Sequence, residues 1–215
     1  MRVRAIGVMG LVAVVCGAAL VCGVPGCSTP QRQQAASPQQ RSLGPPVAPG
    51  QEFRTAYFTA QAPPESGWEL IATHDSLLAI GTMNRKTRES SAATVWATTL
   101  REPPTATQFG DLVDELRRAD SMPPRHKLLH TSEPTQAGNS GLGLAYEMEV
   151  VDQTAPAADG KKPMILEIYA LVRQDPARRN VVVTAKYSYR HAEGTADPES
   201  AKRAKTFLAG IAILP

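Results

Sequence analysis

Cysteine is missing from most of this chain, because its three copies, Cys16, Cys22 and Cys27, precede a stretch of 188 residues without any. That stretch can form no disulfide and supports no thiol chemistry, so a hydrophobic core must stabilise it. An excess of one charge is missing too. Without Arg2 and Arg4, 21 basic residues remain against 20 acidic ones. A nearly neutral chain lacks the positive surface typical of nucleic-acid-binding proteins.

The longest apolar run lies at the N-terminus. Arg2 and Arg4 precede residues 5–24, which carry no charge, and Gly26 stands directly before Cys27. This order of a basic start, an apolar run, a small residue and a cysteine resembles a bacterial lipoprotein signal. The resemblance implies that residues 1–26 are a signal peptide and that Cys27 becomes the lipidated first residue.

A lipidated Cys27 implies a protein anchored to a bacterial membrane, with its domain outside the cytoplasm, in the periplasm or at the cell surface. Two alternatives stay open. Twenty apolar residues are long enough to cross a bilayer of roughly 30 Å as an uncleaved helix, and the segment could be a simple cleaved signal. In all three cases residues 28–215 lie outside the cytoplasm.

Residues 27–50 are expected to form a tether. The stretch from 28 onward contains five prolines and five glutamines, and its large aliphatic side chains are only Leu43 and Val47. Such a segment buries too little apolar surface to offset the entropy of ordering it. Residues 51–215 are then one domain that we expect to fold alone, since 165 residues suffice for a core.

Strand patterns dominate the domain. The expected strands cover residues 53–60, 68–72, 77–83, 94–100, 142–150, 164–172 and 181–190. In the last of these, Val183, Ala185, Tyr187 and Tyr189 fall on one face. Short polar turns between neighbouring strands, such as His74-Asp75-Ser76, predict antiparallel pairing.

Two segments have helical periodicity. The first has apolar residues at Phe109, Leu112, Val113 and Leu116, with Thr105 or Thr107 as the N-cap. The second starts from Asp197 as the N-cap and has its stripe at Ala201, Ala204, Leu208 and Ile211. The predicted fold class is therefore α+β, an antiparallel sheet flanked by helices.

The order of these elements resembles the PsbP-like family. The resemblance rests on Tyr57-Phe58, Pro63-Pro64 and Gly67-Trp68, on the strand at 181–185, and on a closing helix with Phe207-Leu208. It implies an α/β/α sandwich over residues 53–215. It also implies non-enzymatic docking onto larger, often membrane-associated assemblies. No position in this sequence matches a family metal site, so no metal ligand is carried over.

The only glycine-rich run, residues 138–143, contains Ser140. Leu142 occupies the second glycine position of a nucleophile elbow, and a strand follows where a dinucleotide loop needs a helix, so the run is interpreted as a loop entering a strand. His74-Asp75-Ser76 is interpreted as a turn, because consecutive residues cannot converge as a catalytic triad.

His126 and His130 have the i, i+4 spacing of a metal pair on a helix, but no third ligand lies near them in the sequence, and the segment is as easily extended as helical. His191 is expected to be solvated. The basic pairs, among them Arg117-Arg118, are expected at the surface, where some could contact anionic headgroups. Trp68, Trp96 and the tyrosines are expected in or near the core, with the alternative that Tyr187 and Tyr189 serve a binding face if they are exposed.

The leading hypothesis is a lipid-anchored binding or adaptor protein of the cell envelope. It would dock on an envelope assembly, use no cofactor and catalyse no reaction. Its partners would be membrane lipid, through acylated Cys27, and an envelope protein. The alternative is an envelope hydrolase that uses Ser140 or His130 from a loop.

Overall fold

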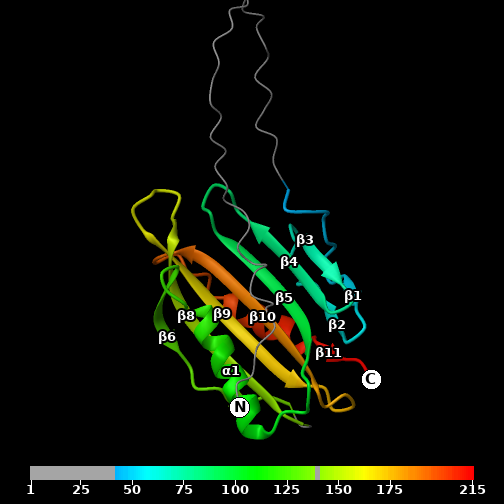
Figure 1. Cartoon of the computed structure of the whole chain (residues 1–215). Helices are drawn as coiled ribbons and strands as arrows, with labels where there is room; N and C mark the ends of the chain where they lie inside the picture. The colour runs from blue at the N-terminus through cyan, green and yellow to red at the C-terminus, as the bar shows by residue number, and fades with distance from the viewer. Residues whose placement is uncertain (1–41, 139–140) are drawn as a thin grey trace, which may run out of the picture. The chain divides into compact units, whose positions relative to one another are not determined.

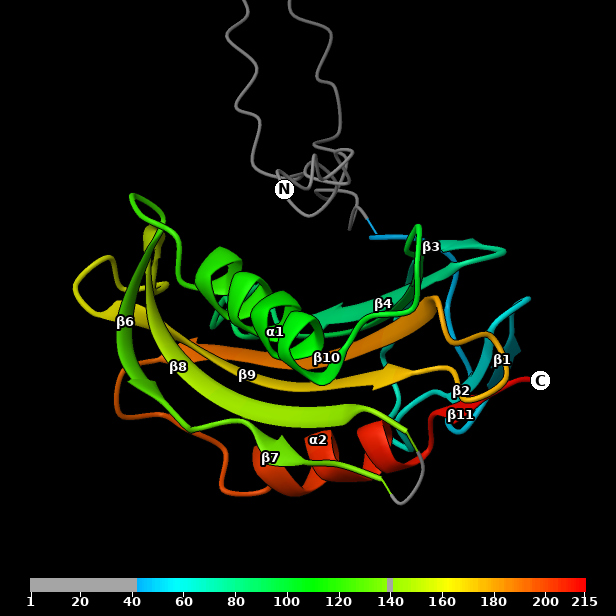
Figure 2. The ribbon, with the colours of Figure 1, turned by 60° about the horizontal axis from the view of Figure 1, so that its bottom comes forward.

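The structure is a computed structural model, which describes residues 42–138 and 141–215. Its main sheet runs in the order β3 (Glu69–His74), β4 (Leu77–Met83), β5 (Ser90–Thr99), β10 (Val181–Ala192), β9 (Pro163–Gln174), β8 (Gly143–Pro156) and β6 (His126–Thr131). A short strand, β7 (Thr135–Gln136), also pairs with β8. All the pairings are antiparallel, and the sheet is strongly curved (Figures 1 and 2).

One helix covers each face of this sheet (Figure 2). Helix α1 (Ala106–Asp120) lies on the concave face and α2 (Ser200–Ala209) on the opposite one. The α+β fold class predicted from the sequence, an antiparallel sheet flanked by helices, is therefore confirmed. No helix among the described residues has both the length and the apolarity needed to cross a membrane.

Each helix closes its own hydrophobic core. Beneath α1, Phe109 and Val113 pack on alternate residues of β8 and β9. Beneath α2, Phe207 and Ala204 pack on the other face, around Tyr187. The strand alternation predicted for residues 142–150 and 183–189 explains this division, because side chains two residues apart point to the same face.

Helix α1 begins where the sequence predicts. Thr105 is its N-cap: its hydroxyl accepts the backbone N–H of Gln108 at 3.3 Å, and the Gln108 side chain accepts the backbone N–H of Thr105 at 2.9 Å. This reciprocal pair is a capping box. At the other end, Ser121 bonds the carbonyl oxygens of Arg117 and Arg118. Both ends of the helix are therefore fixed by polar side chains.

The second helix starts later than predicted. Asp197 is not its N-cap, because α2 begins at Ser200 with Glu199 before it. Instead Asp197 closes a turn in front of the helix, where its carboxylate accepts the backbone N–H of Glu199 at 2.9 Å and its carbonyl accepts that of Ser200 at 3.0 Å.

The expected single strand at residues 53–60 is wrong. It is a hairpin of β1 (Glu52–Arg54) and β2 (Phe58–Gln61), and β2 also pairs with β11 (Ala212–Ile213), which the sequence analysis missed. Thr55 makes the turn: its hydroxyl accepts the backbone N–H of Phe58 at 3.0 Å. A β-branched polar residue inside a strand pattern here acts as a turn former.

The tether predicted for residues 27–50 is too long, because its last part belongs to the domain. Pro46 pairs with Glu69, and the backbone N–H of Val47 donates to the Trp68 carbonyl at 2.8 Å. Val47 itself is buried in the core beneath α2. Proline is tolerated at this sheet edge because no ladder donor is required of it. Residues 27–41 of the predicted tether, with Cys27, lie outside the described residues.

Candidate binding surface between α1 and β6

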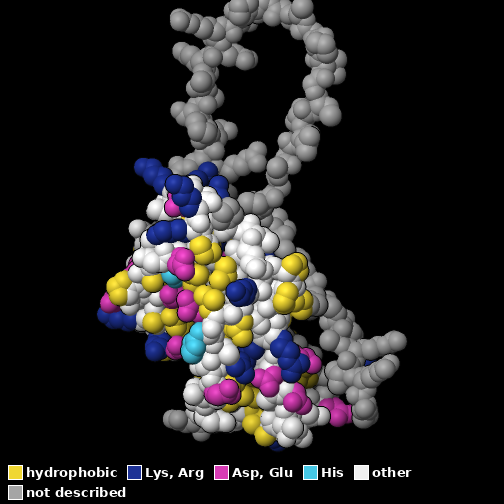
Figure 3. All heavy atoms as spheres, turned by 90° about the vertical axis from the view of Figure 1, so that its left-hand side faces the viewer, with side chains coloured by type: hydrophobic (Ala, Val, Ile, Leu, Met, Phe, Trp, Pro, Cys, Tyr) yellow, Lys and Arg dark blue, Asp and Glu magenta, His cyan; other side chains and the backbone are white. Residues whose placement is uncertain are grey.

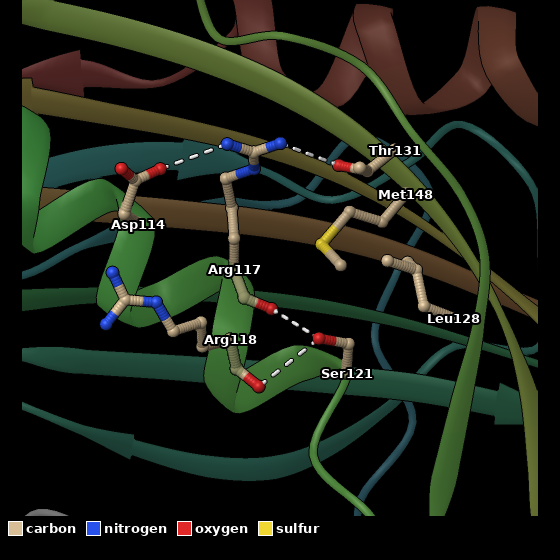
Figure 4. A pocket seen from close by; sticks show the side chains of 7 residues that line it. All are labelled: Asp114, Arg117, Arg118, Ser121, Leu128, Thr131 and Met148. Atoms are coloured by element: carbon tan, nitrogen blue, oxygen red, sulfur yellow. Dashed lines mark hydrogen bonds and ion pairs between the residues drawn. The ribbon is translucent and has the colours of Figure 1, made fainter.

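The concave face carries a hollow between the C-terminal half of α1 and strand β6 (Figure 4). Its volume is about 290 Å³, and its lining residues are Asp114, Arg117, Arg118, Ser121, Leu128, Thr131 and Met148. Leu128 and Met148 form an apolar wall opposite the polar helix end. The volume is at the lower limit of the roughly 300–1,000 Å³ of ligand pockets.

Arg117 joins the helix to the strand. Its guanidinium donates to Asp114 at 3.0 Å and to the Thr131 hydroxyl at 3.0 Å (Figure 4). It also donates to the Ser132 carbonyl at 3.0 Å. The sequence analysis placed this arginine at the solvated surface, which is wrong, because its side chain is only 16 % exposed. Its two terminal nitrogens thus join α1 to the end of β6 and fix one wall of the hollow, while its buried Nε has no hydrogen-bond partner among the described residues.

Asp120, the last residue of α1, forms a second set of contacts between the helix and the sheet. Its carboxylate accepts from the Lys186 ammonium at 2.6 Å and from the Tyr146 hydroxyl at 3.0 Å. Burial and the neighbouring carboxylate raise the pKa of Tyr146, so this phenol stays a neutral donor. The end of the helix is thereby bonded to both β8 and β10.

Asp152 on β8 forms ion pairs that join the sheet to the loop that follows α1. Its carboxylate is 3.4 Å from the Arg125 guanidinium and 3.3 Å from that of Arg190. Burial opposes the charged form, but hydrogen bonds from Thr154 and the two guanidinium charges lower the pKa of Asp152. The carboxylate is therefore charged at neutral pH and binds the 121–125 loop to the sheet.

His126 belongs to this framework and not to a metal site. It begins β6, and its Nδ1 lies 2.7 Å from the Asp120 carbonyl oxygen. His130 is exposed near the other end of the strand. Among residues 42–138 and 141–215, no group of three or more His, Cys, Asp or Glu side chains is arranged to hold a metal ion.

On the opposite face, His191 contacts Glu167 and not solvent, which corrects the sequence prediction. Its Nε2 is 3.3 Å from the Glu167 carboxylate, which also accepts from Ser200 at 2.7 Å and from Tyr169 at 3.1 Å. A catalytic serine must bond the histidine, whereas here serine and histidine both bond the acid. His191 and Ser200 are also buried. This cluster stabilises the α2 packing.

The remaining predicted residues do not converge either. Ser140 lies outside the described residues, and the part of its loop that is described leads into β8, as predicted. His74 and Ser76 form a local turn contact between β3 and β4, with the Ser76 backbone N–H 3.3 Å from His74 Nδ1. Tyr187 and Tyr189 are buried in the core. Sequence reasoning missed the surface between α1 and β6, because its residues come from separate segments.

A comparison with protein-family models finds no match for this chain, and neither does one with curated proteins. Among solved structures, the Ran-binding protein Mog1p of Saccharomyces cerevisiae and a mutant of protein Mog1 are similar. Each is 11% identical in sequence, with a TM-score of 0.37 over 73% of this chain and 89% or 90% of the other. Likeness at this level supports no statement about what this chain binds.

Proposed function

We propose that the chain is a lipid-anchored protein of the bacterial cell envelope that binds an envelope component and catalyses no reaction. The anchor is Cys27, preceded by Gly26 and by the apolar residues 5–24. We also propose that its domain has the PsbP-like fold. A helix on each face of an antiparallel sheet is compatible with that fold.

One observation carries the binding function. Around the α1–β6 hollow, ion pairs hold the helix end and the loop, and β6 is held by its pairing with β8 and by the hydrogen bond from Arg117 to Thr131. The loop and β6 nevertheless present large apolar side chains to solvent. Exposed apolar side chains gathered on a rigid framework are typical of interaction surfaces. By contrast, the Ser76 hydroxyl lies 3.4 Å from His74 Nδ1 only within an exposed turn, and the Ser200 hydroxyl bonds Glu167 instead of a histidine.

The anchor is tested by replacing Cys27 with serine in the full chain. Cell fractionation and the intact mass of the protein are then compared with those of the wild type. We expect the wild type to be membrane-bound with the mass of a chain that starts at an acylated Cys27, and Cys27→Ser to lose the lipid mass and remain unprocessed. If both proteins are bound at the same precursor mass, residues 5–24 are a retained membrane anchor and the lipoprotein assignment is wrong.

The absence of catalysis is tested by a screen of the same purified proteins against ester, glycan, phosphate and peptide substrates. We expect no turnover. Turnover that is abolished by Ser140→Ala or His130→Ala, with the fold intact, would support the alternative envelope hydrolase and overturn this proposal.

A further inference from the structure

Three of the six large apolar side chains that are exposed in the described residues lie within eight positions of one another. Met122 is 46 % exposed, Leu128 is 44 % and Leu129 is 49 %. The backbone N–H of His126 donates to the Met122 carbonyl at 3.2 Å, which folds the loop back against the start of β6. We call Met122, Leu128 and Leu129, with Arg118 and Lys127, the 118–129 surface.

The charge available at this surface is positive. Arg118 and Lys127 are exposed, and neither forms an ion pair within the described part of the chain. The only acid between positions 118 and 129 is Asp120, which Lys186 neutralises. Figure 3 shows the side of the molecule on which β6 lies: apolar side chains reach solvent there, with basic and acidic ones around them.

Apolar side chains beside unpaired lysine and arginine suit a surface of anionic phospholipid. The apolar groups enter the boundary between headgroups and acyl chains, while the cations contact the headgroups. An added peptide strand fits β6 less well. The strand has a bulge between Leu128 and His130 that interrupts its hydrogen-bonding row, and Lys127 lies beside it; both features discourage strand addition.

The tether is long enough for this contact. Its end, at Pro45 and Pro46, is paired with β3, and β6 lies six strand spacings away across the sheet, or about 29 Å. The fourteen residues 28–41 reach about 45 Å when fully extended. A chain anchored at Cys27 can therefore place either edge of the sheet on the membrane, so the surface chemistry decides which one.

We propose that the 118–129 surface docks on anionic phospholipid and orients the domain on the membrane that holds its anchor. The proposal deepens the proposed function and rests on its lipid anchor. The ion pairs of Asp120 and Asp152 serve this docking by keeping Met122 and Leu129 in place before contact, which reduces the entropy lost on binding.

The experiment uses the lipidated protein processed from the full chain, which begins at the acylated Cys27, so that a cysteine introduced in the domain is its only free thiol. Leu129→Cys carries an environment-sensitive fluorophore. Ile71→Cys is the matched control, because Ile71 is an apolar side chain with 50 % exposure on the opposite edge strand, β3. Both proteins are reconstituted in vesicles of phosphatidylcholine, alone or mixed with phosphatidylglycerol, that contain brominated lipid.

We expect the lipid to quench the label at Leu129 several-fold more than the label at Ile71, and only in vesicles with phosphatidylglycerol. Arg118→Gln and Lys127→Gln should each weaken docking roughly fivefold. Equal quenching at both positions in anionic vesicles would overturn the proposal. So would a Leu129 label that is shielded in cells but not in vesicles, since a protein would then cover this surface.

Two further measurements separate docking from lipidation of Cys27 and from effects of a single labelled position. The mass of the labelled chain shows whether Cys27 carries lipid, so a failure of the lipoprotein assignment is distinguished from a failure of docking. A second label at Met122→Cys must give the same answer as the one at Leu129, because Met122 is exposed and its carbonyl accepts the backbone N–H of His126 at the start of β6.

Discussion

At the scale of single residues, the protonation of His191 depends on how its two ring nitrogens are placed. Nδ1 lies 2.9 Å from the Ala192 carbonyl, so the neutral ring donates there and leaves Nε2 without a proton. Only the imidazolium ion can donate from Nε2 to Glu167. Burial would lower the pKa of His191, but Glu167 and the Ala192 carbonyl raise it. In turn, burial opposes ionisation of Glu167, but His191, Ser200 and Tyr169 lower its pKa.

These shifts predict a pH window for stability. The raised pKa of His191 stabilises the fold below its ordinary value of 6.5, and this effect is lost as pH rises through the folded-state value. The lowered pKa of Glu167 stabilises the fold above its ordinary value of 4.5, and this is lost as pH falls through the folded-state value. His191→Gln should therefore reduce the free energy of unfolding by about 1–2 kcal/mol between these values, and by less on either side.

Urea unfolding of the wild type and the variant at a series of pH values measures this difference. His130→Gln is the matched control, because this histidine is exposed and its replacement should change the free energy of unfolding by no more than about 0.5 kcal/mol. A His191→Gln effect that is constant from acid to alkaline pH would show that the ion pair does not contribute.

Charged residues were the hardest to place from the sequence. Arg117 has a charged neighbour and a helical position typical of solvent exposure, yet it is bonded to Thr131 and Ser132, which lie on another element. His191 lies near the end of β10, but its side chain contacts Glu167 on the neighbouring strand β9. Local patterns give the face of an element on which a residue lies; the polar partner depends on strand register, which the sequence alone did not provide.

At the scale of elements, the concave core depends on α1. Phe109 and Val113 are its fully buried residues, and Leu112 and Leu116 are only partly buried beside them. Val113→Asp would bury a carboxylate against Tyr146 and Val150 without a partner. We expect a loss of several kcal/mol, which is a large part of a typical total stability of roughly 5–15 kcal/mol.

Thermal unfolding followed by circular dichroism tests this expectation. Glu115→Ala, at an exposed position of the same helix, should change stability by no more than about 0.5 kcal/mol. If Val113→Asp melts like the wild type, α1 does not close a core, and its apolar stripe would have to be considered a further interaction surface.

Elements with a strong period were predictable, and short ones were not. The stripe from Phe109 to Leu116 and the alternation around Tyr187 each specify a face, and both agree with the structure. The two-residue strand β11 has no period to detect, and the β1–β2 hairpin depends on one turn at Thr55. Of the candidate binding surface, the sequence predicted the helix but not its pairing with β6, because the hollow joins residues from positions 114 to 148.

At the scale of the whole molecule, the two edge strands of the main sheet, β3 and β6, differ in how they are protected from pairing with another molecule. Residues 45–47 run along β3, where the Pro45 carbonyl accepts the backbone N–H of Leu70 at 2.8 Å. At the other edge, within residues 42–138 and 141–215, β6 is protected by its bulge and by Lys127. The segment expected as tether thus covers one edge, and covered edges resist the edge-to-edge pairing that leads to aggregation.

This cover predicts that the domain boundary matters for stability. A fragment of residues 51–215 lacks the buried Val47 and the two backbone hydrogen bonds that join residues 45–47 to Trp68 and Leu70. Burying a valine contributes about 1.5–2 kcal/mol and each hydrogen bond about 1 kcal/mol, partly offset by the entropy of ordering the segment. We expect the shorter fragment to be about 2 kcal/mol less stable than residues 42–215, and to aggregate more readily.

Urea unfolding and light scattering of the two fragments measure these effects. Val47→Ala in the longer fragment separates the contributions, because it removes most of the buried side chain and keeps both hydrogen bonds; it should cost about 1–2 kcal/mol. Equal unfolding midpoints for the two fragments would mean that residues 42–50 do not stabilise the domain. The longer fragment should also scatter less light, since β3 is then covered and one edge of the main sheet is no longer open to pairing with a second molecule.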